Sequence, residues 1–554
     1  MSGAAYRSKP WLAQYAQGLP ATIEPAFSNM LDAFQAVVAR TPDATALQYF
    51  DGRTSYAQLD HAAQVLAAAL HARGFGRGDR LGLYTQNNPA FVIGLLAAWK
   101  LGAVGVAINP MNRQRELSYL LTNAGVAALL CLDTLYTSVA REVIASDAPQ
   151  VHTVVTFSAL DGQTGADTRV LDVAARLPVG EGVLDLAALV AAPAVPQAWS
   201  AVPLTADDVA LLTYTSGTTG NPKGGMNTHG NMAFNAQTYR DWVGLTPQDC
   251  VLGVAPLFHI TGSVGHVAVS LLTGCTLVLC HRFQAEVMLE QMRQHQPTFT
   301  IGAITAFIAL MNHPGAKASD FASFRAIYSG GAPIAPSTLA QFEAFSGHYI
   351  HNAFGMTETA SPTHFVPLGA RAPVDPNSGA ISIGVPVFNT EVRIVKDDGQ
   401  EAAVGEVGEI YDRGPQVMRG YWNMPEATQA TMGDGWLRTG DVAFMDAQGW
   451  FYLVDRKKDM INAAGYKVWP REVEDVLYTH PAVREAAVVG VPDDYRGETV
   501  KAVVSFKPGM QATVEELVVH CKSNLAAYKY PRIVEIMDEL PKTVTGKILR
   551  RNLR

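Results

Sequence analysis

The sequence lacks the features that mark secreted and disulfide-stapled proteins. Only five of its 554 residues are cysteine, and none of the five forms a CxxC pair. The odd number and the wide spacing argue against a disulfide framework and against metal ligation, so we expect buried free thiols. The start of the chain, residues 1–7, has no apolar signal-peptide core. These absences predict a cytoplasmic protein.

Long hydrophobic runs and positive charge are also scarce. The longest nearly charge-free run, residues 264–280, contains glycine and His266 and is short for a membrane span, so we expect buried strand and helix there and no integral membrane segment. Lysine and arginine total 42 against 50 aspartate and glutamate, a formal net charge of −8. With no basic run, nucleic acid is not expected as a partner.

The first third of the chain alternates helical and strand patterns. Ser55 has the spacing of a capping-box residue before an amphipathic helix, and residues 81–84 form a short apolar strand pattern. Pro89 marks the first turn of a second helix, and residues 103–108 return to a strand pattern. Strand–helix–strand units at this spacing predict a parallel sheet covered by helices.

The rest of the chain predicts further domains, because 554 residues exceed what one core supports. Residues 187–203 look like an irregular connector before a second α/β unit. We therefore expect an α/β fold: a large N-terminal domain (1–455) of two βαβ-type subdomains plus a small β subdomain (about 385–455). A mobile α+β C-terminal domain (456–554) follows, joined through an exposed charged segment at 455–459.

The most informative segment is residues 213–224, which places hydroxyls, glycines and one lysine between two apolar runs. Glycines let backbone N–H groups approach an anion, hydroxyls donate from several directions, and lysine adds a point charge. Pro222 separates the last glycine from the lysine, so this is not a Walker motif. We expect phosphate contacts from Thr215, Ser216, Gly217, Thr218, Thr219, Gly220 and Lys223.

By the order of its residues this loop resembles the phosphate loop of the acyl-adenylate-forming superfamily, which comprises acyl-CoA synthetases, luciferases and peptide-synthetase adenylation domains. The resemblance covers roughly residues 30–554. It extends through five further segments, which are residues 256–259, 329–333, 352–358, 436–441 and 540–551.

The resemblance implies a nucleotide site. His259 would lie beside the acyl group, Phe354 would stack on adenine in place of the commoner tyrosine, and Thr357 would contact phosphate. Glu358 would hold Mg²⁺, a hard cation that prefers oxygen ligands and neutralises the phosphates of ATP. The neighbouring nucleotide contacts implied in the same way are Gly330, Gly331, Ala332, Asn352, Ala353 and Gly355.

The C-terminal motifs imply the moving parts. Asp441 would accept from the ribose hydroxyls, and Arg456 would reach ribose or phosphate. Lys547 corresponds to the lysine that enters the site during adenylation, whereas Lys542 reads as a surface charge. In the family the small domain rotates between two half-reactions; Lys458 matches the hinge, and Gly465 lies on the segment that would face the thiol channel.

The implied reaction is that of an acid–thiol ligase: ATP and a carboxylic acid give acyl-AMP and pyrophosphate, and coenzyme A then takes the acyl group. Three alternatives stay open, namely an enzyme that loads a carrier protein, a luciferase-like oxidoreductase and a catalytically inactive nucleotide-binding protein. Intact Glu358, Asp441 and Lys547 argue against the last. Asn462 stands where some relatives have lysine, which weakens a luciferase-like assignment.

The acid is read from apolar segments. After the phosphate loop the chain offers Met232, Phe234 and Trp242 rather than an acidic residue for an ammonium group. Residues 301–310 are apolar with several alanines, and small residues deepen a cleft. This favours a medium- or long-chain fatty acid, although the same segment would also suit a core. A homodimer is compatible with the sequence.

Overall fold

The structure is a computed structural model of the whole chain. It describes residues 4–171, 180, 182–192, 200–215, 221–332, 334–376, 379–456, 459–463, 466–493, 497–543 and 547–554.

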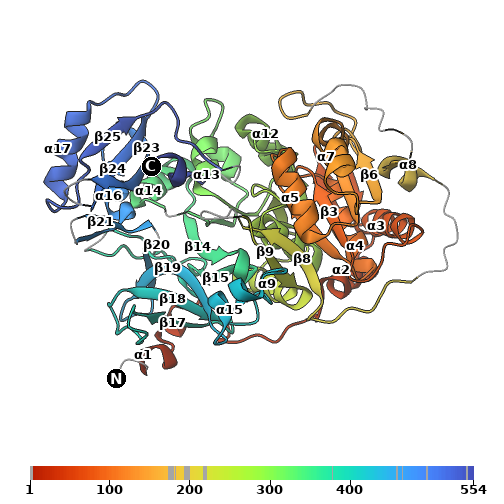
Figure 1. Cartoon of the computed structure of the whole chain (residues 1–554), viewed down its shortest axis with the longest axis horizontal. Helices are drawn as coiled ribbons and strands as arrows, with labels where there is room; N and C mark the ends of the chain where they lie inside the picture. The colour runs from red at the N-terminus through yellow and green to blue at the C-terminus, as the bar shows by residue number, and fades with distance from the viewer. Residues whose placement is uncertain are drawn as a thin grey trace.

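A seven-stranded sheet forms the first α/β unit, at the right of Figure 1. Its strand order is β7-β6-β5-β3-β4-β8-β9, and all neighbours are parallel except β8 and β9. Its strands are β3 (Arg80–Tyr84), β4 (Val104–Ile108), β5 (Ala128–Leu132), β6 (Thr153–Phe157), β7 (Leu184–Asp185), β8 (Val209–Tyr214) and β9 (Gly224–Thr228). The predicted parallel, helix-covered sheet is thereby confirmed.

A nine-stranded sheet forms the second unit, in the order β16-β15-β14-β13-β12-β10-β11-β1-β2. Its inner strands are parallel and its two ends are antiparallel. The strands are β1 (Thr45–Tyr49), β2 (Gly52–Ser55), β10 (Cys250–Leu252), β11 (Thr276–Leu279), β12 (Phe299–Gly302), β13 (Ala326–Ser329), β14 (Ile350–Met356), β15 (Ser361–Phe365) and β16 (Val385–Pro386). The N-terminal hairpin β1–β2 thus joins the sheet of the second unit.

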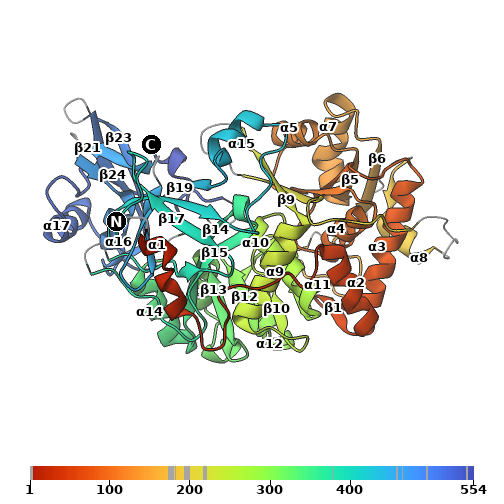
Figure 2. The same cartoon turned by 90° about the horizontal axis from the view of Figure 1, so that it is seen from below.

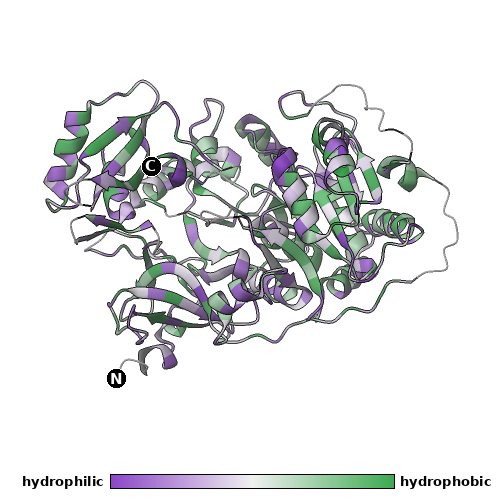
Figure 3. Cartoon of the chain, in the orientation of Figure 1, coloured by the Kyte–Doolittle hydropathy of each residue, from purple (hydrophilic) through white to green (hydrophobic). Residues whose placement is uncertain are grey.

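The helices begin where the sequence supplies caps. The side chain of Ser55 accepts from the Gln58 N–H and starts α3 (Tyr56–His71), and Asn88 caps α4 (Pro89–Lys100) in the same way. Figure 3 shows that the inner strands are mainly hydrophobic, whereas hydrophobic and hydrophilic residues alternate along the helices that cover them. The other main helices are α2 (Met30–Arg40), α5 (Gln114–Ala124), α9 (His229–Val243), α11 (Val269–Thr273), α12 (Ala285–His295), α13 (Ile304–Met311) and α14 (Pro336–Ser346).

A single buried cluster contains side chains from both large sheets, for example Leu81 of β3 and Val251 of β10, so the two units share one core. The long charge-free run predicted to be buried strand and helix does lie there, with α11 and β11 inside it. Four of the five cysteines are buried and Cys250 is partly exposed, and all five are free thiols.

The β subdomain is a four-stranded antiparallel sheet of β17 (Glu391–Val395), β18 (Gly408–Arg413), β19 (Leu437–Met445) and β20 (Phe451–Arg456). In Figure 1 it lies below the C-terminal domain and to the left of the large sheets, and the short helix α1 (Ala4–Arg7) lies beside it in both views (Figures 1 and 2).

The C-terminal domain has its own buried core, separate from that of the large sheets and including Val488, Val504 and Leu517. Its elements are β21 (Ile461–Ala463), β22 (Tyr466–Val468), α16 (Pro470–Tyr478), β23 (Val483–Asp493), β24 (Gly497–Phe506), α17 (Val514–Asn524) and β25 (Ile533–Ile536). A separate core is what a domain needs to move as a unit.

Two sequence expectations are wrong at the connections. Residues 187–191 of the predicted irregular connector belong to helix α8 (Leu186–Ala191), which the side chain of Asp185 caps. The predicted exposed joint begins with a buried residue: Asp455 is 6% exposed, because charged partners from the C-terminal domain surround it. Over the described residues, the helices are all too short or too polar to cross a membrane.

Candidate active site

The candidate site lies where the parallel strands β12, β13 and β14 end. Ligands of open α/β sheets bind at these carboxyl ends. The Gly330 N–H donates to the Gly302 carbonyl at 3.2 Å, which draws the segment after β13 against the end of β12. Gly331 has a φ of 81°, and a Cβ added there would meet no atom within 4 Å. This backbone and Ala332 therefore form an open, side-chain-poor surface, as a flat base requires.

Strand β14 brings the next set of predicted residues to the same edge. The Asn352 amide is buried and donates to the Ser382 carbonyl, which fixes the strand beside Ala353. The ring of Phe354 packs edge-on against the ring of His364, with 5.6 Å between the ring centroids. Gly355 is the next residue of the strand. Thr357 and Glu358 come directly after the strand, in a short helical turn, and both are buried.

The predicted phosphate loop connects antiparallel strands β8 and β9. The Thr215 N–H donates to the Lys223 carbonyl at 2.9 Å, which closes the base of the loop. Helix α5 supports it, because the Tyr119 hydroxyl donates to the Pro222 carbonyl at 2.9 Å. Thr215 and Lys223 thus lie side by side at the base of the loop. Ser216, Gly217, Thr218, Thr219 and Gly220 lie outside the described residues.

The predicted ribose residues occupy neighbouring strands of the β subdomain. Asp441 of β19 lies opposite Arg456 of β20 in the antiparallel register, and Asp441 is buried. The side chain of Arg456 lies outside the described part of the chain. Asp412 of β18 is close by and fully buried; burial and the charge of Asp441 raise its pKa to about 7.

The charge of Lys547, in the C-terminal domain, acts on His259 in the N-terminal part of the chain. Burial, together with the charge of Lys547, lowers the pKa of His259 to about 4. The imidazole is therefore neutral at pH 7, and Lys547 lies near enough to influence it. The Lys547 N–H donates to Thr543 Oγ1 at 3.1 Å, and the Thr543 N–H donates back to the Lys547 carbonyl. This small loop holds the lysine in place.

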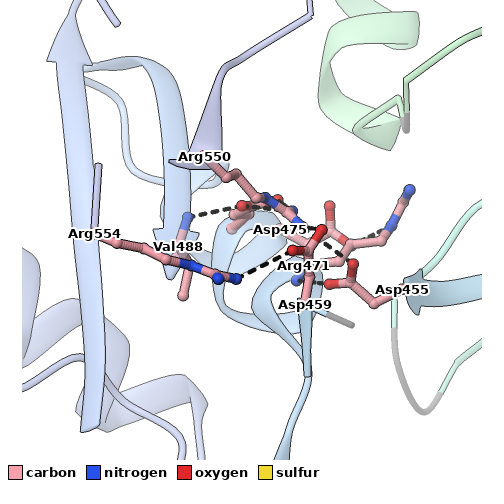
Figure 4. A network of polar contacts seen from close by, with 8 residues as sticks. Asp455, Asp459, Arg471, Asp475, Val488, Arg550 and Arg554 are labelled. Carbon is pink, nitrogen blue, oxygen red and sulfur yellow. Dashed lines mark hydrogen bonds and ion pairs between the residues drawn. The ribbon is translucent and has the colours of Figure 1, made fainter. Parts of the chain in front are cut away.

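A network of ion pairs anchors the segment that carries Lys547 (Figure 4). The Arg550 guanidinium bonds Asp455 of β20 at 3.1 Å and both carboxylate oxygens of Glu474 at 2.8 Å, and it lies 3.5 Å from Asp459. Glu474 also accepts from the Val488 N–H, so α16 and β23 are tied to the same arginine. Because Asp455 belongs to the N-terminal part of the chain, Arg550 spans the boundary between the two domains.

Glu358 is the residue that fits a magnesium ion. Over the described residues no group of three or more His, Cys, Asp or Glu side chains is placed to hold a metal ion. Mg²⁺ commonly takes one or two carboxylates and completes its shell with substrate phosphates and water. A single buried carboxylate next to the phosphate loop matches that donor set.

The predicted acyl segment is divided between core and surface. In α13, Ile304, Phe307 and Leu310 are buried, whereas Ala306, Ala309 and the N-cap residue Ala303 are only partly buried, and Ala306 packs against the core. The reading of residues 301–310 as core therefore holds for one face only. The three apolar residues predicted after the phosphate loop all lie buried in or near α9, and Trp242 packs on Phe365 and Phe388.

Some predicted positions cannot be placed, and one is corrected. Lys458 and Gly465 lie outside the described residues. Lys542 is not a simple surface charge: it is 19% exposed and forms ion pairs with Glu485 at 2.8 Å and Glu539 at 3.0 Å. The pairs raise the pKa of Lys542 although its burial opposes this.

Sequence reasoning also missed Tyr421, whose hydroxyl donates to Glu358 at 2.6 Å. Its one sequence signal is a Gly-Tyr-Trp run, which carries no motif by itself. Arg550 was missed as well, because a basic residue near a chain terminus usually lies in solvent.

The molecule has two open, mainly parallel sheets, and the residues expected to bind a nucleotide lie at the carboxyl ends of their strands. This arrangement is typical of nucleotide-binding enzymes. The chain belongs to the AMP-binding enzyme family: the model of that family matches residues 34–422, and the model of its C-terminal domain matches residues 472–547.

Relatives share nearly the whole length. A long-chain-fatty-acid–CoA ligase of Bacillus subtilis is 35% identical over 570 residues, covering 98% of this chain and 97% of the relative. A feruloyl-CoA synthase of an Amycolatopsis species is 37% identical over 515 residues, covering 93% and 96%. The solved anthranilate CoA ligase AuaEII, in complex with anthranoyl-AMP, superposes with a TM-score of 0.84 at 28% identity and covers 97% of each chain.

Proposed function

We propose that the protein is an ATP-dependent acyl-CoA ligase that activates a medium- or long-chain fatty acid. The acid and ATP would give acyl-AMP and pyrophosphate, and the thiol of coenzyme A would then take the acyl group and release AMP. The near-complete match to long-chain-fatty-acid–CoA ligases supports this assignment. The observation that carries it is that the charge of Lys547, from the C-terminal domain, acts on His259 of the N-terminal part, so two of the expected site residues from different domains lie within electrostatic range of each other.

In the first half-reaction the acid's carboxylate attacks the α-phosphorus of ATP, and charge grows on the phosphate oxygens. Preorganised cations and donors lower that barrier most. Lys547 and Lys223 supply cations, and Thr357 supplies a hydroxyl. Mg²⁺, held by Glu358 and the phosphates, would neutralise further charge. His259 is neutral at pH 7, so it serves as an uncharged wall beside the carboxylate.

The rest of the site would orient the nucleotide. Phe354 would stack on adenine against the backbone of 330–332, and Asp441 would accept from both ribose hydroxyls, with Arg456 opposite it. The phosphate loop, Thr215 to Lys223, would hold the triphosphate.

For the second half-reaction we propose a rotation of the C-terminal domain about residue 458. Its separate core is compatible with movement as a rigid unit. Rotation would withdraw Lys547 and bring the segment of Gly465 to the entry path of the thiol. Coenzyme A is the thiol that the named relatives use.

The partly exposed alanine face of α13 supports an aliphatic tail, because small side chains leave room for methylene groups. A second candidate substrate is an aryl acid of the ferulate type, favoured by the feruloyl-CoA synthase relative at 37% identity. We further propose a cytoplasmic location. A homodimer stays a prediction, which light scattering of the purified protein tests.

A turnover screen tests the proposal. Wild-type protein is supplied with ATP, Mg²⁺, coenzyme A and straight-chain acids from butyrate to palmitate, with ferulate and benzoate in parallel. We expect AMP and an acyl-CoA thioester, with kcat/KM highest for medium or long chains. Highest kcat/KM with ferulate would transfer the assignment to the second candidate. Thioester formation on an acyl carrier protein but not on coenzyme A would contradict the proposed thiol.

A further inference from the structure

A short segment, Met418–Trp422, joins three parts of the site without belonging to any motif. We call it the strap. The Arg419 N–H donates to the Met226 carbonyl at 3.0 Å, and the Met226 N–H donates to the Gly420 carbonyl at 2.8 Å. The Trp422 N–H donates to Gly224 in the same way, so the strap runs antiparallel along β9, the strand that leaves the phosphate loop.

The strap also reaches the segment that carries Glu358. The Met418 N–H donates to the Glu358 carbonyl at 2.8 Å. Between the two lies Gly225, where an added Cβ would stand 3.1 Å from the Thr357 methyl and 3.3 Å from the Met418 sulfur. A side chain would not fit without displacement, so β9, the strap and the turn of Thr357 and Glu358 are packed as one unit.

Tyr421 is the side chain through which this unit touches the charged groups of the site. It is 7% exposed, and its hydroxyl donates to Glu358 Oε1 at 2.6 Å. The ammonium of Lys223 lies 4.9 Å from the centre of the Tyr421 ring, within the range of a cation–π contact.

We infer that Tyr421 is a positioning residue for the metal–triphosphate end of the substrate, because one side chain orients both the carboxylate of Glu358 and the cation of Lys223. The inference rests on the function proposed above. A carboxylate has a broad terminal torsion, and an O–H···O⁻ bond restricts it. Partners that orient a metal-binding carboxylate typically change metal affinity or activity 10–100-fold when removed.

Two substitutions separate the contributions of Tyr421. Tyr421→Phe removes the hydroxyl and keeps the ring under Lys223. Tyr421→Leu removes both. The matched control is Tyr452→Phe, because Tyr452 is also a buried tyrosine whose hydroxyl donates to a carboxylate, Asp446 Oδ2 at 2.9 Å, and it lies in the β subdomain.

The test uses the full chain with Mn²⁺ as a paramagnetic probe and α,β-methylene-ATP as a non-reacting nucleotide. Electron paramagnetic resonance measures the dissociation constant of Mn²⁺ from the ternary complex. We expect this constant to rise about tenfold or more in Tyr421→Phe and to stay at the wild-type value in Tyr452→Phe. Tyr421→Leu should in addition weaken binding of the metal-free nucleotide, because Lys223 loses its ring contact.

Catalysis supplies the second readout. In Tyr421→Phe the free Mg²⁺ needed for half-maximal acid-dependent ATP–pyrophosphate exchange should rise by a similar factor. The KM for the acid, and thioester formation from supplied acyl-AMP, should not change.

Wild-type Mn²⁺ binding and Mg²⁺ dependence in Tyr421→Phe, with a loss of folding stability like that of Tyr452→Phe, would make Tyr421 purely structural and overturn the inference. Failure of the proposed function looks different, because the wild-type protein would then show no acid-dependent exchange at any Mg²⁺ concentration.

Discussion

Replacing Arg550 by methionine should destabilise the C-terminal domain strongly while leaving the large sheets intact. Arg550 bonds both oxygens of Glu474 at 2.8 Å and Asp455 at 3.1 Å, and both carboxylates are less than 10% exposed. Methionine keeps most of the apolar stem and removes the charge. Removing one partner of a buried ion pair costs about 3–5 kcal/mol, because the remaining charge is left uncompensated.

The loss should depend on pH, and its sign follows from Glu474. Burial already raises the pKa of Glu474 above its usual 4.5, and Arg550 opposes the rise. Without Arg550 the pKa rises further, so the folded protein holds a proton that the unfolded chain releases. Stability then falls as pH rises through that window. Arg550→Met should therefore be most destabilising near pH 8 and less so near pH 5.

Hydrogen exchange of the β23 and β24 amides, measured by mass spectrometry on the full chain, reports the opening of this domain. A loss of 3–5 kcal/mol lowers amide protection by roughly 10²–10⁴-fold. Arg554→Gln is the matched control: Arg554 is 48% exposed and pairs with Asp459, so its loss should cost less than about 1 kcal/mol. The double variant Arg550→Met/Glu474→Gln should regain much of the protection.

The reasoning fails if Arg550→Met loses no more protection than Arg554→Gln, or if its loss is the same at pH 5 and pH 8.

Three further predictions concern the site. Lys547→Ala should lower acid-dependent ATP–pyrophosphate exchange by about 10²–10³-fold and spare thioester formation from supplied acyl-AMP, since the lysine acts on the first transition state only; equal losses in both assays would contradict this. Asp412→Asn should stabilise the protein at pH 8 by up to about 4 kcal/mol, measured by urea unfolding, and far less at pH 4. The reason is that the folded carboxyl of Asp412, with a pKa of about 7, keeps a proton that the unfolded chain loses as pH rises. A stability difference that does not depend on pH would refute the raised pKa of Asp412. Ala306→Phe should shift chain-length preference towards short acids by about two orders of magnitude if three or four methylene groups are displaced, at about 0.8 kcal/mol each, with the KM for ATP unchanged; an identical profile would place Ala306 outside the acyl site.

Local patterns predicted the sheets well because the determinants are local. The Ser55 cap, the Asn88-Pro89 start and the apolar runs fix helices and strands within a few residues, and the structure has them there. Sheet membership was not predictable in the same way. The hairpin β1–β2 joins β11, which is more than 200 residues away in the sequence. Such a parallel pairing depends on which strand edge is still unpaired after the rest of the chain has folded, and no local pattern specifies that edge.

The candidate site shows the same division. Thr357, Glu358 and the nucleotide segments lie in short motifs, so their sequence identified them. Tyr421 and Arg550 act through partners that are 63 and 76 residues away, on other elements. No spacing rule connects them to Glu358 or Glu474. The buried position of Asp455 was mispredicted for this reason, since its compensating charge comes from the far end of the chain.

The most direct test of the account follows the oxygen atoms of the acid. A fatty acid labelled with ¹⁸O in both carboxylate oxygens is incubated with the protein, ATP, Mg²⁺ and coenzyme A, and the nucleotide and phosphate products are analysed by mass spectrometry. Attack of the carboxylate on the α-phosphorus makes one labelled oxygen the bridge of acyl-AMP, and this oxygen leaves with AMP when the thiol attacks the acyl carbon. We therefore expect equal amounts of singly labelled AMP, unlabelled pyrophosphate and acyl-CoA that keeps the second labelled oxygen in its carbonyl. Label in inorganic phosphate with formation of ADP, or unlabelled AMP, would contradict an acyl-adenylate intermediate.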